Sequence, residues 1–506
     1  MSRFLKKYWY LVALAFVLLL GGFLRFYRIS EISNFSYDQA RDTDKIREMI
    51  QERKIILLGP STSVSQGGFG YGTTYFGPIY YYLLIPSLWL AKFDPVGPIA
   101  FTALLGTLSI FLIYFIMIKL TKDKSASVLS SFLYAISPAA IEYSRFIWNP
   151  NFIPFFALLL FLGLLKFKQK KSKFWCFIVG LFSGVLIQFH FYTYFLVLFA
   201  LIFLLLNSKK KFLETLFFYG FGFILGIFPM IIFDIRHNFL NSRSIFFNLF
   251  RLSSHSNKSF GFKVANLIAL IKRIIDDFVG TNMFALRLIL ITLMGGAIVL
   301  FLLNKKFRKQ YRMIILLFVW GCLASSIFNR QGIVEKRYLL PLSPFIFIFL
   351  GIIISQLNKR RITAIFSLIL GAMLIISILP NTIKKTFTSH PVSLGYCRDT
   401  AFLIIKDVQE GNFDYKINIA NLADLDRRAT SFRYFFNAQK IPILGVEDYP
   451  NADILYVIDK DYNWDGIVNN TDTWEVYSFE PKVLLDTIDG PEGVKIYKIG
   501  KKKKNG

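Results

Sequence analysis

The chain has 506 residues, of which 54% are hydrophobic, 17% aromatic and only 18% charged. This composition excludes a soluble cytosolic enzyme and a disordered chain, and it is typical of a polytopic α-helical membrane protein. The formal net charge is +27. It does not indicate nucleic-acid binding, because most basic residues stand in short clusters between apolar runs.

Apolar runs long enough to cross a bilayer recur along most of the chain. The first run is not followed by a small-residue cleavage pattern, so it predicts a membrane helix and not a removed signal peptide. The long run 174–206 is divided at Gln188–His190, where polar residues interrupt it. Taking about 17 residues as the minimum for a span, we predict about eleven transmembrane helices. They occupy residues 8–24, 96–118, 126–143, 151–165, 174–190, 191–206, 212–233, 284–303, 311–328, 338–356 and 362–380.

The basic clusters predict how these helices are oriented. The clusters stand at residues 3–7, 119–124, 166–173, 209–211, 305–312 and 359–361. All of them fall on one side if the run 75–91, which carries Pro78 and Pro86, lies in the outer interface and does not cross. By the positive-inside rule that side is the cytoplasm. We therefore predict a multi-pass protein of the plasma membrane with a cytoplasmic N-terminus.

The composition changes near residue 386. Residues 1–386 are predicted to form the membrane domain, with its first outer loop at 25–95. Residues 387–506 alternate helix-like stretches with β-rich runs, which is typical of a small α/β domain, extracytoplasmic on this topology. The expected helices are 399–410 and 425–437, and the expected strands are 415–420, 453–459, 474–479 and 494–499.

The first outer loop holds the most informative motif, Phe35-Ser-Tyr-Asp-Gln-Ala-Arg-Asp42. Ser36 and Gln39 have the spacing of a capping box, which predicts a helix that begins here. Asp38 then stands in the first turn, where the helix dipole favours an ionised carboxylate. An ionised carboxylate suits a general base.

The predicted helix has a polar face and an apolar stripe. The polar face follows from spacings of three and four residues and contains Asp38, Arg41, Asp42 and Lys45. The stripe, suited to lying against a membrane, contains Ile46, Met49 and Ile50. The alternative interpretation is a capped, solvated amphipathic helix without a catalytic role.

The order of these features resembles the GT-C membrane glycosyltransferases. After the first span and the acidic loop come a Gly77-Pro-Ile-Tyr-Tyr-Tyr82 segment, many further spans and a soluble domain. Over residues 8–380 the chain is similar to the family 39, or protein mannosyltransferase-like, and lipid A aminoarabinose transferase-like enzymes. The resemblance implies transfer of a sugar from a polyprenyl-phosphate carrier to an acceptor on the non-cytoplasmic side, with Asp38 as the base. Neighbouring candidates for substrate binding are Tyr37, Arg41 and Asp42.

One segment departs from the family pattern. Many relatives place a second Asp in the next outer loop, after an Arg and within a Pro-Asp pair. Here the segment contains Arg145, Asn149 and Asn151, which are kept as candidate substrate ligands. An amide can hydrogen-bond a sugar or phosphate, but it is neither a base nor a strong metal ligand. We therefore predict no cofactor and no required divalent metal. A turn residue before Pro150 is the alternative for Asn149.

Further outer positions are candidate ligands of the donor. His190 stands at a predicted membrane exit, although a lone His more often has a structural role. Arg236 and His237 fit a phosphate site or, alternatively, a solvated helix end. Arg337 and Tyr338 open a late span, where relatives have a similar Arg-Tyr…Pro pattern. A guanidinium pairs phosphate oxygens bidentately, and interface snorkelling is its alternative role.

These patterns favour one function. We predict an inverting glycosyltransferase that moves a mannose-like hexose from a polyprenyl-phosphate carrier to an unidentified glycan, lipid or protein acceptor, with Asp38 as general base. The expected partners are membrane lipid and the lipid-linked donor, with no nucleic acid. A lipid-linked glycan flippase or transporter is the competing class, although the spans carry few ionisable groups and no detectable repeat. A non-catalytic envelope scaffold and an O-antigen polymerase-like enzyme are further alternatives.

Overall fold

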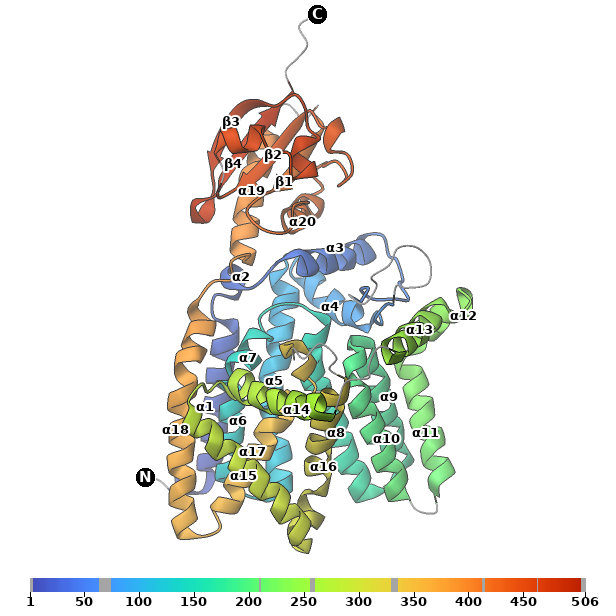
Figure 1. Ribbon diagram of the computed structural model, residues 1–506, viewed down its shortest axis with the longest axis vertical. Coiled ribbons are helices and arrows are strands. Elements are labelled where there is room, and N and C mark those ends of the chain that lie inside the picture. Colours follow the sequence, from blue (N-terminus) through green and yellow to red (C-terminus); the bar gives the residue numbers. More distant parts are fainter. Residues whose placement is uncertain are drawn as a thin grey trace, which may run out of the picture. The chain divides into compact units, whose positions relative to one another are not determined.

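The chain folds as two compact units. The computed structural model describes residues 3–62, 74–208, 211–254, 260–328, 335–411, 415–461 and 463–501. The first unit, called the helical unit below, comprises Met1–Tyr27, Ile56–Leu83 and Phe101–Phe387. The second, called the sheet unit, comprises Arg28–Ile55, Leu84–Ala100 and Thr388–Gly506. Figure 1 labels the helices and strands of both.

The helical unit is built of α-helices, because in lipid a spanning segment must satisfy its backbone polar groups internally. Its longer helices are α1 (Arg3–Phe26), α8 (Ile153–Lys170), α9 (Lys173–Phe189), α10 (Tyr194–Ser208), α11 (Phe212–Gly226), α13 (Leu240–Ser254), α14 (Phe260–Arg273), α15 (Phe284–Leu303), α16 (Lys305–Phe328), α17 (Ser343–Leu357) and α18 (Arg361–Phe387). Its shorter elements are α6 (Lys124–Ala135), α7 (Pro138–Glu142), η1 (Asn149–Phe152), η2 (Phe191–Thr193), α12 (Phe228–Arg236), η4 (Ile274–Val279) and η5 (Lys336–Leu339). Helices α4 (Ile79–Leu90) and α5 (Val96–Thr121) have residues in both units.

Within the described residues, six helical segments are long and apolar enough to cross a membrane. They are Lys7–Ile32, Val96–Thr121, Asn149–Lys170, Phe191–Ser208, Phe284–Leu303 and Arg361–Phe387. The pair α11 and α12, bent by 70° at its break, makes a seventh candidate. Helices α4, α9 and α17 are apolar but shorter. The protein is therefore a multi-pass membrane protein, as its sequence predicts.

The run 126–143, expected as one span, is broken in the structure. Helix α6 ends at Ala135, and Ser137 caps α7 by accepting a hydrogen bond of 3.3 Å from the backbone N–H of Ala140. Pro138 occupies the first position of α7. A proline favours a helix start, because its missing N–H would have no partner inside the helix there. The expected division at Gln188–His190 is confirmed, since α9 ends immediately before His190.

Glycines let α9 and α11 approach each other closely. A Cβ at Gly184 would lie 2.6 Å from the carbonyl oxygen of Phe223, and one at Gly226 would lie 2.6 Å from that of Leu181. Such distances are shorter than real carbon contacts, so both positions require glycine. This small-residue packing is how helices associate in lipid, where burying apolar side chains brings little gain.

The sheet unit contains a four-stranded sheet with strand order β1-β2-β4-β3. Strands β1 and β2 are parallel, whereas β4 is antiparallel to both of its neighbours. The elements after residue 388 are α19 (Leu394–Glu410), β1 (Ile417–Asn421), α20 (Thr430–Gln439), η6 (Tyr449–Asn451), β2 (Ile454–Asp459), α21 (Trp464–Val468), α22 (Trp474–Tyr477), β3 (Val483–Asp489), η7 (Pro491–Gly493) and β4 (Lys495–Gly500). The earlier elements of this unit include α2 (Ile29–Ile32) and α3 (Tyr37–Gln51). The expected C-terminal α/β fold is therefore confirmed.

One expected strand is wrong, because residues 474–479 form the helical turn α22 and its exit. Val476 and Phe479 are both fully buried in the core of the sheet unit. Their spacing of three residues fits a helical turn, whereas the aromatic and β-branched composition of the run is typical of a strand. The edge strand β3 was not expected, because most of its residues are exposed and show no alternation.

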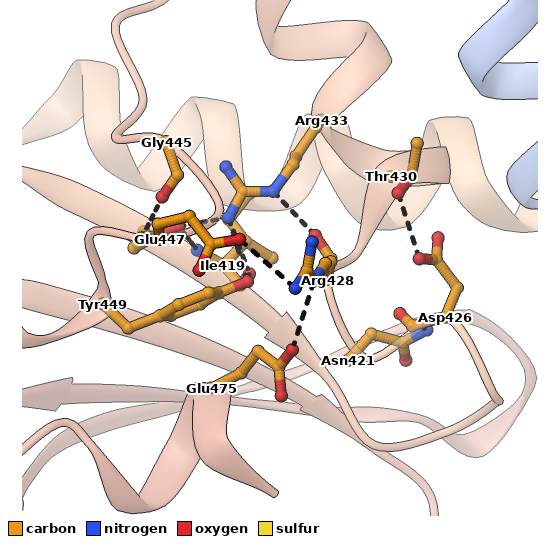
Figure 2. A network of polar contacts seen from close by, with 11 residues as sticks. Ile419, Asn421, Asp426, Arg428, Thr430, Arg433, Gly445, Glu447, Tyr449 and Glu475 are labelled. Carbon is orange, nitrogen blue, oxygen red and sulfur yellow. Dashed lines mark hydrogen bonds and ion pairs between the residues drawn. The ribbon is translucent and has the colours of Figure 1, made fainter. Parts of the chain in front are cut away.

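Arg433 of α20 ties this helix to the loops around β1, as Figure 2 shows. Its guanidinium donates to the carbonyl oxygens of Arg428 at 2.7 Å, Leu444 at 2.7 Å and Ile419 at 3.2 Å. It also donates to the hydroxyl of Tyr449 at 3.1 Å. The side chain is buried, so these bonds replace the water that a charged group would otherwise keep.

Candidate functional site

Helix α3 begins where its sequence predicts. The backbone N–H of Ser36 donates to Oε1 of Gln39 at 3.2 Å, and the Ser36 hydroxyl lies 2.6 Å from the same oxygen. This is the expected capping box. Asp38 therefore stands in the first turn of α3, near the positive end of the helix dipole.

The guanidinium of Arg41 lies between two carboxylates. It pairs with Asp38 at 2.9 Å and with Asp42 at 2.8 Å. The Asp42 side chain is completely buried, whereas the Asp38 side chain is 44% exposed. Asp42 therefore anchors Arg41 from the protein side, and Asp38 presents its carboxylate to solvent. The ring of Tyr37 lies 5.7 Å from the Arg41 guanidinium, within cation–π range.

The remaining expectations for α3 are corrected. Lys45 pairs with Glu48 at 2.9 Å and takes no part in the Asp38–Arg41–Asp42 group. Ile46 and Met49 are buried, and α3 packs against α20 of the sheet unit. The apolar stripe is therefore a protein-packing surface and not a surface that faces a membrane or solvent.

A cluster of aromatic rings surrounds His190 in the helical unit. The rings of Tyr192 and Tyr338 stack with centroids 4.3 Å apart. The His190 ring lies 5.8 Å from Tyr338 and 4.9 Å from Phe76. Of these, Phe76 and Tyr192 were not among the candidates from sequence. The enrichment of aromatic residues at the ends of membrane helices is a signal that could have found them.

A backbone hydrogen bond holds the His190 ring in one tautomer. Its Nδ1 accepts a hydrogen bond of 3.0 Å from the backbone N–H of Tyr192, so the ring proton is assigned to Nε2. Burial, together with the positive charge of Arg337, lowers the pKa of the His190 imidazole to about 3. The imidazole is therefore available as a hydrogen-bond donor through Nε2.

Arg337 adjoins the same aromatic cluster. Its guanidinium carbon lies 5.1 Å from the ring of Tyr338 and 5.6 Å from that of Trp148. Its ion pair is with Glu335 at 2.6 Å. Stacked rings, a neutral imidazole and a guanidinium together can hold the apolar face of a sugar ring, its hydroxyls and a phosphate.

Arg145 is engaged by the backbone. Its guanidinium donates to the carbonyl oxygens of Lys385 at 3.1 Å, Thr386 at 2.7 Å and Tyr27 at 2.8 Å. Two of these carbonyls end α18, where a cation interacts favourably with the helix dipole. Burial lowers the pKa of the Arg145 guanidinium to about 10. In this geometry Arg145 stabilises a helix end.

The two candidate asparagines also bind carbonyls. Asn149 donates to the carbonyl oxygen of Phe189, the last residue of α9, at 2.5 Å. Asn151 donates to that of Phe146 at 2.8 Å. The Oδ1 atom of Asn151 is buried, and no described residue bonds it. Asn151 also lines a cavity with an empty volume of 320 Å³ inside the helical unit, which includes space open to solvent.

Arg236 and His237 lie at the end of α12 and stand apart from the other candidates. Both side chains are exposed. The His237 ring stacks on Phe233 at 4.1 Å, and its Nδ1 lies 2.9 Å from the Phe233 carbonyl oxygen. In the described chain neither side chain bonds another candidate residue.

Two groups of candidates thus form, each within one unit, whereas Arg145, Asn149, Asn151, Arg236 and His237 belong to neither group. The Asp38–Arg41–Asp42 group belongs to the sheet unit, and the cluster of His190, Tyr338 and Arg337 belongs to the helical unit. Within the described residues, no group of three or more His, Cys, Asp or Glu side chains could hold a metal ion. A multi-pass helical protein with an acidic helix in its first loop and a C-terminal α/β domain has the architecture of the GT-C glycosyltransferases.

The comparisons with known proteins agree with that class. Residues 76–233 match the family model described as dolichyl-phosphate-mannose-protein mannosyltransferase. The chain is similar in structure to ArnT from Cupriavidus metallidurans bound to undecaprenyl phosphate, with a TM-score of 0.57 at 10% identity, covering 97% of this chain and 98% of that one. The apo ArnT structure gives a TM-score of 0.58 at 11% identity, with the same coverage. No curated protein matches the chain. The resemblance predicted from the sequence is therefore confirmed at the level of the fold.

Proposed function

We propose that the protein is a membrane glycosyltransferase that takes a sugar from a polyprenyl-phosphate carrier. The observation that carries this proposal is the position of Asp38. It stands in the first turn of a capped helix and is paired with Arg41 at 2.9 Å. The match to the mannosyltransferase family model over residues 76–233 supports this function. The ArnT structure supports the class of carrier, because that protein binds undecaprenyl phosphate.

The proposed reaction is an inverting displacement. The Asp38 carboxylate takes the proton of an acceptor hydroxyl while that oxygen attacks the anomeric carbon of the sugar. The bond between the anomeric carbon and the phosphate oxygen breaks, and the polyprenyl phosphate leaves from the opposite face. Arg41 holds the Asp38 carboxylate in place through the ion pair of 2.9 Å.

The aromatic cluster of the helical unit supplies the proposed donor contacts. Arg337 would pair with the leaving phosphate, whose charge increases as the bond breaks. Tyr338 would stack on the sugar, and His190 would donate from Nε2 to a sugar hydroxyl. Arg236 is a second candidate for the phosphate. Since the Arg145 guanidinium is occupied by carbonyl oxygens, we assign it to stabilising the end of α18 and not to binding the donor.

We propose a mannose-like hexose as the sugar and the outer face of the plasma membrane as the place of transfer. An Arg-held monophosphate leaving group would react without an obligatory metal. The acceptor is a hydroxyl of a glycan, a lipid or a protein. A glycan flippase is the competing function, and it predicts that Asp38 is dispensable for moving the lipid-linked sugar.

The test is sugar transfer by the purified protein in reconstituted membranes. The donors are radiolabelled polyprenyl-phosphate mannose and related polyprenyl-phosphate sugars, with crude envelope extract as acceptor. Asp38→Asn should lower kcat by about 100-fold to 10,000-fold, because a general base contributes on that scale. Donor binding should persist, since Asp38 contacts the acceptor and not the carrier.

The matched control is Glu48→Gln. It makes the same carboxylate-to-amide change on α3, but outside the Asp38–Arg41–Asp42 group. It should keep transfer near the wild-type rate. Equal activity of Asp38→Asn and wild type would contradict the assigned base and direct attention to Asp42. Movement of the lipid-linked sugar across the membrane without any transfer would support the flippase.

A further inference from the structure

The segment that carries Asp38 is bound to the C-terminal residues of the sheet unit by backbone hydrogen bonds. The N–H of Phe35 donates to the carbonyl oxygen of Val392 at 2.9 Å, and the N–H of Leu394 donates to that of Ser33 at 2.7 Å. These bonds lie at the beginning of α19 and a few residues before Asp38. Helix α2 also packs against α19. The base therefore follows a stretch of chain that is fixed to α19.

Phe35 adds a side-chain anchor to this attachment. Its ring is completely buried and lies 5.6 Å from the ring of Tyr434 and 5.8 Å from that of Phe435, both in α20. The sulfur of Cys397 contacts the Phe35 carbonyl oxygen at 3.7 Å. Phe35 therefore contacts both α19 and α20, three residues before Asp38.

A polar contact holds α3 itself on α20. The amide of Asn437 donates to Oδ2 of Asp44 at 2.9 Å. Asp44 is also paired with Arg47 at 2.7 Å. Burial raises the pKa of the Asp44 carboxyl, although the bonds from Arg47 and Asn437 act against this rise. Because this carboxylate is largely removed from water, each of its remaining bonds matters to the position of the helix.

Helix α3 needs such support, because it has only 15 residues. An isolated helix shorter than about 12 to 15 residues is marginal in water, and protein helices of this size are stabilised mainly by packing. The packing surface of α3 within its unit is α20. Without that surface, α3 would lose the packing that stabilises it, and the position of Asp38 would no longer be fixed.

We infer that the C-terminal domain positions the catalytic base, with α19 and α20 as its platform and Phe35 and Asn437 as positioning residues. The inference rests on the proposed function, because it takes Asp38 as the base. On this inference the C-terminal domain affects the reaction through the position of Asp38, separately from any acceptor binding. The alternative is that α19 and α20 only complete the fold of the sheet unit.

The decisive variant pair weakens and then restores the attachment in the full-length protein. Asp44→Cys combined with Asn437→Cys removes the hydrogen bond between α3 and α20, together with the ion pair between Asp44 and Arg47. A short bis-methanethiosulfonate reagent joins the same positions again through two disulfides, which a reductant opens. The native cysteines are all buried, so the reagent meets the new pair first. In the reduced form kcat should fall by about tenfold to 100-fold with an unchanged KM for the donor, because small misplacement of a catalytic group acts on the chemical step. Cross-linking should restore kcat, and reductant should lower it again.

Two simpler variants accompany this pair. Asn437→Ala should lower kcat in the same way, and Gln439→Ala, an exposed change on the same helix, should not. A kcat that stays at the wild-type value in Asn437→Ala and in the reduced cysteine pair would overturn the inference. So would a loss of activity on cross-linking, since α3 would then have to leave α20 during the reaction.

Hydrogen exchange measures the attachment independently of activity. In Asn437→Ala the amides of α3 should lose protection while those of α19 keep theirs. Unchanged protection in α3 would overturn the inference even if the wild type transfers sugar. Absence of transfer by the wild type with every donor would count against the proposed function, and the exchange result would still decide whether α20 holds α3.

Discussion

The two units achieve close packing in opposite ways. In the helical unit, α9 and α11 meet where side chains are missing, at glycines such as Gly184 and Gly226. In the sheet unit, the segment just before α3 meets α20 through large rings, because Phe35 packs on Tyr434 and Phe435. In water, the hydrophobic effect drives apolar rings together. Lipid is already apolar, so helices associate there mainly through close van der Waals packing. The surrounding solvent therefore decides whether a contact between helices is made by large side chains or by glycines that have none.

The largest expected effect comes from Gly180→Leu in α9, which would break the glycine contact. A Cβ at this position would overlap the backbone at Tyr219 of α11, and backbone cannot move aside as a flexible side chain can. The purified variant should fail to give a monodisperse, folded protein in detergent. Gly220→Ala is the control, because nothing lies within 4 Å of a Cβ there. A Gly180→Leu protein with a wild-type Tm would show that α9 and α11 do not need this contact.

A smaller effect is expected from Arg433→Met, which tests whether the sheet unit also depends on buried polar bonds. The change leaves carbonyl oxygens and the Tyr449 hydroxyl without their donor, at a cost of about 3 kcal/mol of unfolding free energy. Arg428→Met, nearby in Figure 2 but about half exposed, should cost less than about 1 kcal/mol. Denaturant unfolding of the full-length protein, followed by hydrogen exchange in β1 and β2, measures both. Equal destabilisation by the two variants would mean that burial of the Arg433 guanidinium is not what matters.

The smallest expected effect is a pH dependence from His190 in the helical unit. The folded pKa is about 3 against the ordinary value of 6.5, so between these values the unfolded chain binds a proton that the folded chain does not. Stability therefore falls as the pH is lowered below 6.5, by about 1 to 2 kcal/mol between pH 7.5 and pH 5. His190→Gln should reduce the difference in Tm between these two pH values. A variant with the same pH dependence as the wild type would assign it to other groups.

Local features of the site were predictable from the sequence. Ser36 and Gln39 stand three residues apart, and this short-range spacing predicted the beginning of α3 and the first-turn place of Asp38. The polar interruption after Gln188 likewise predicted where α9 ends. Each of these features depends on interactions between residues that are close in sequence, so the sequence alone is enough to predict them.

Long-range features were not predictable in this way. The stripe of Ile46 and Met49 has the spacing of a membrane-facing helix, and only the presence of α20 shows that it packs against protein. Arg145 fits a phosphate ligand by its residue type, but its guanidinium bonds the end of α18, about 240 residues later in the chain. Periodicity describes which side of an element is apolar and does not name the partner.

The attachment of α3 to α20 also has a consequence for biosynthesis. The residues joined by the Asp44–Asn437 hydrogen bond are 393 positions apart. At a synthesis rate of about 5 to 20 residues per second, α3 leaves the ribosome roughly 20 to 80 seconds before α20 exists. During that interval the spans can enter the membrane, but the helix that carries Asp38 has no platform. A nascent chain that stops before α20 would therefore occupy the membrane as an unfinished, inactive protein.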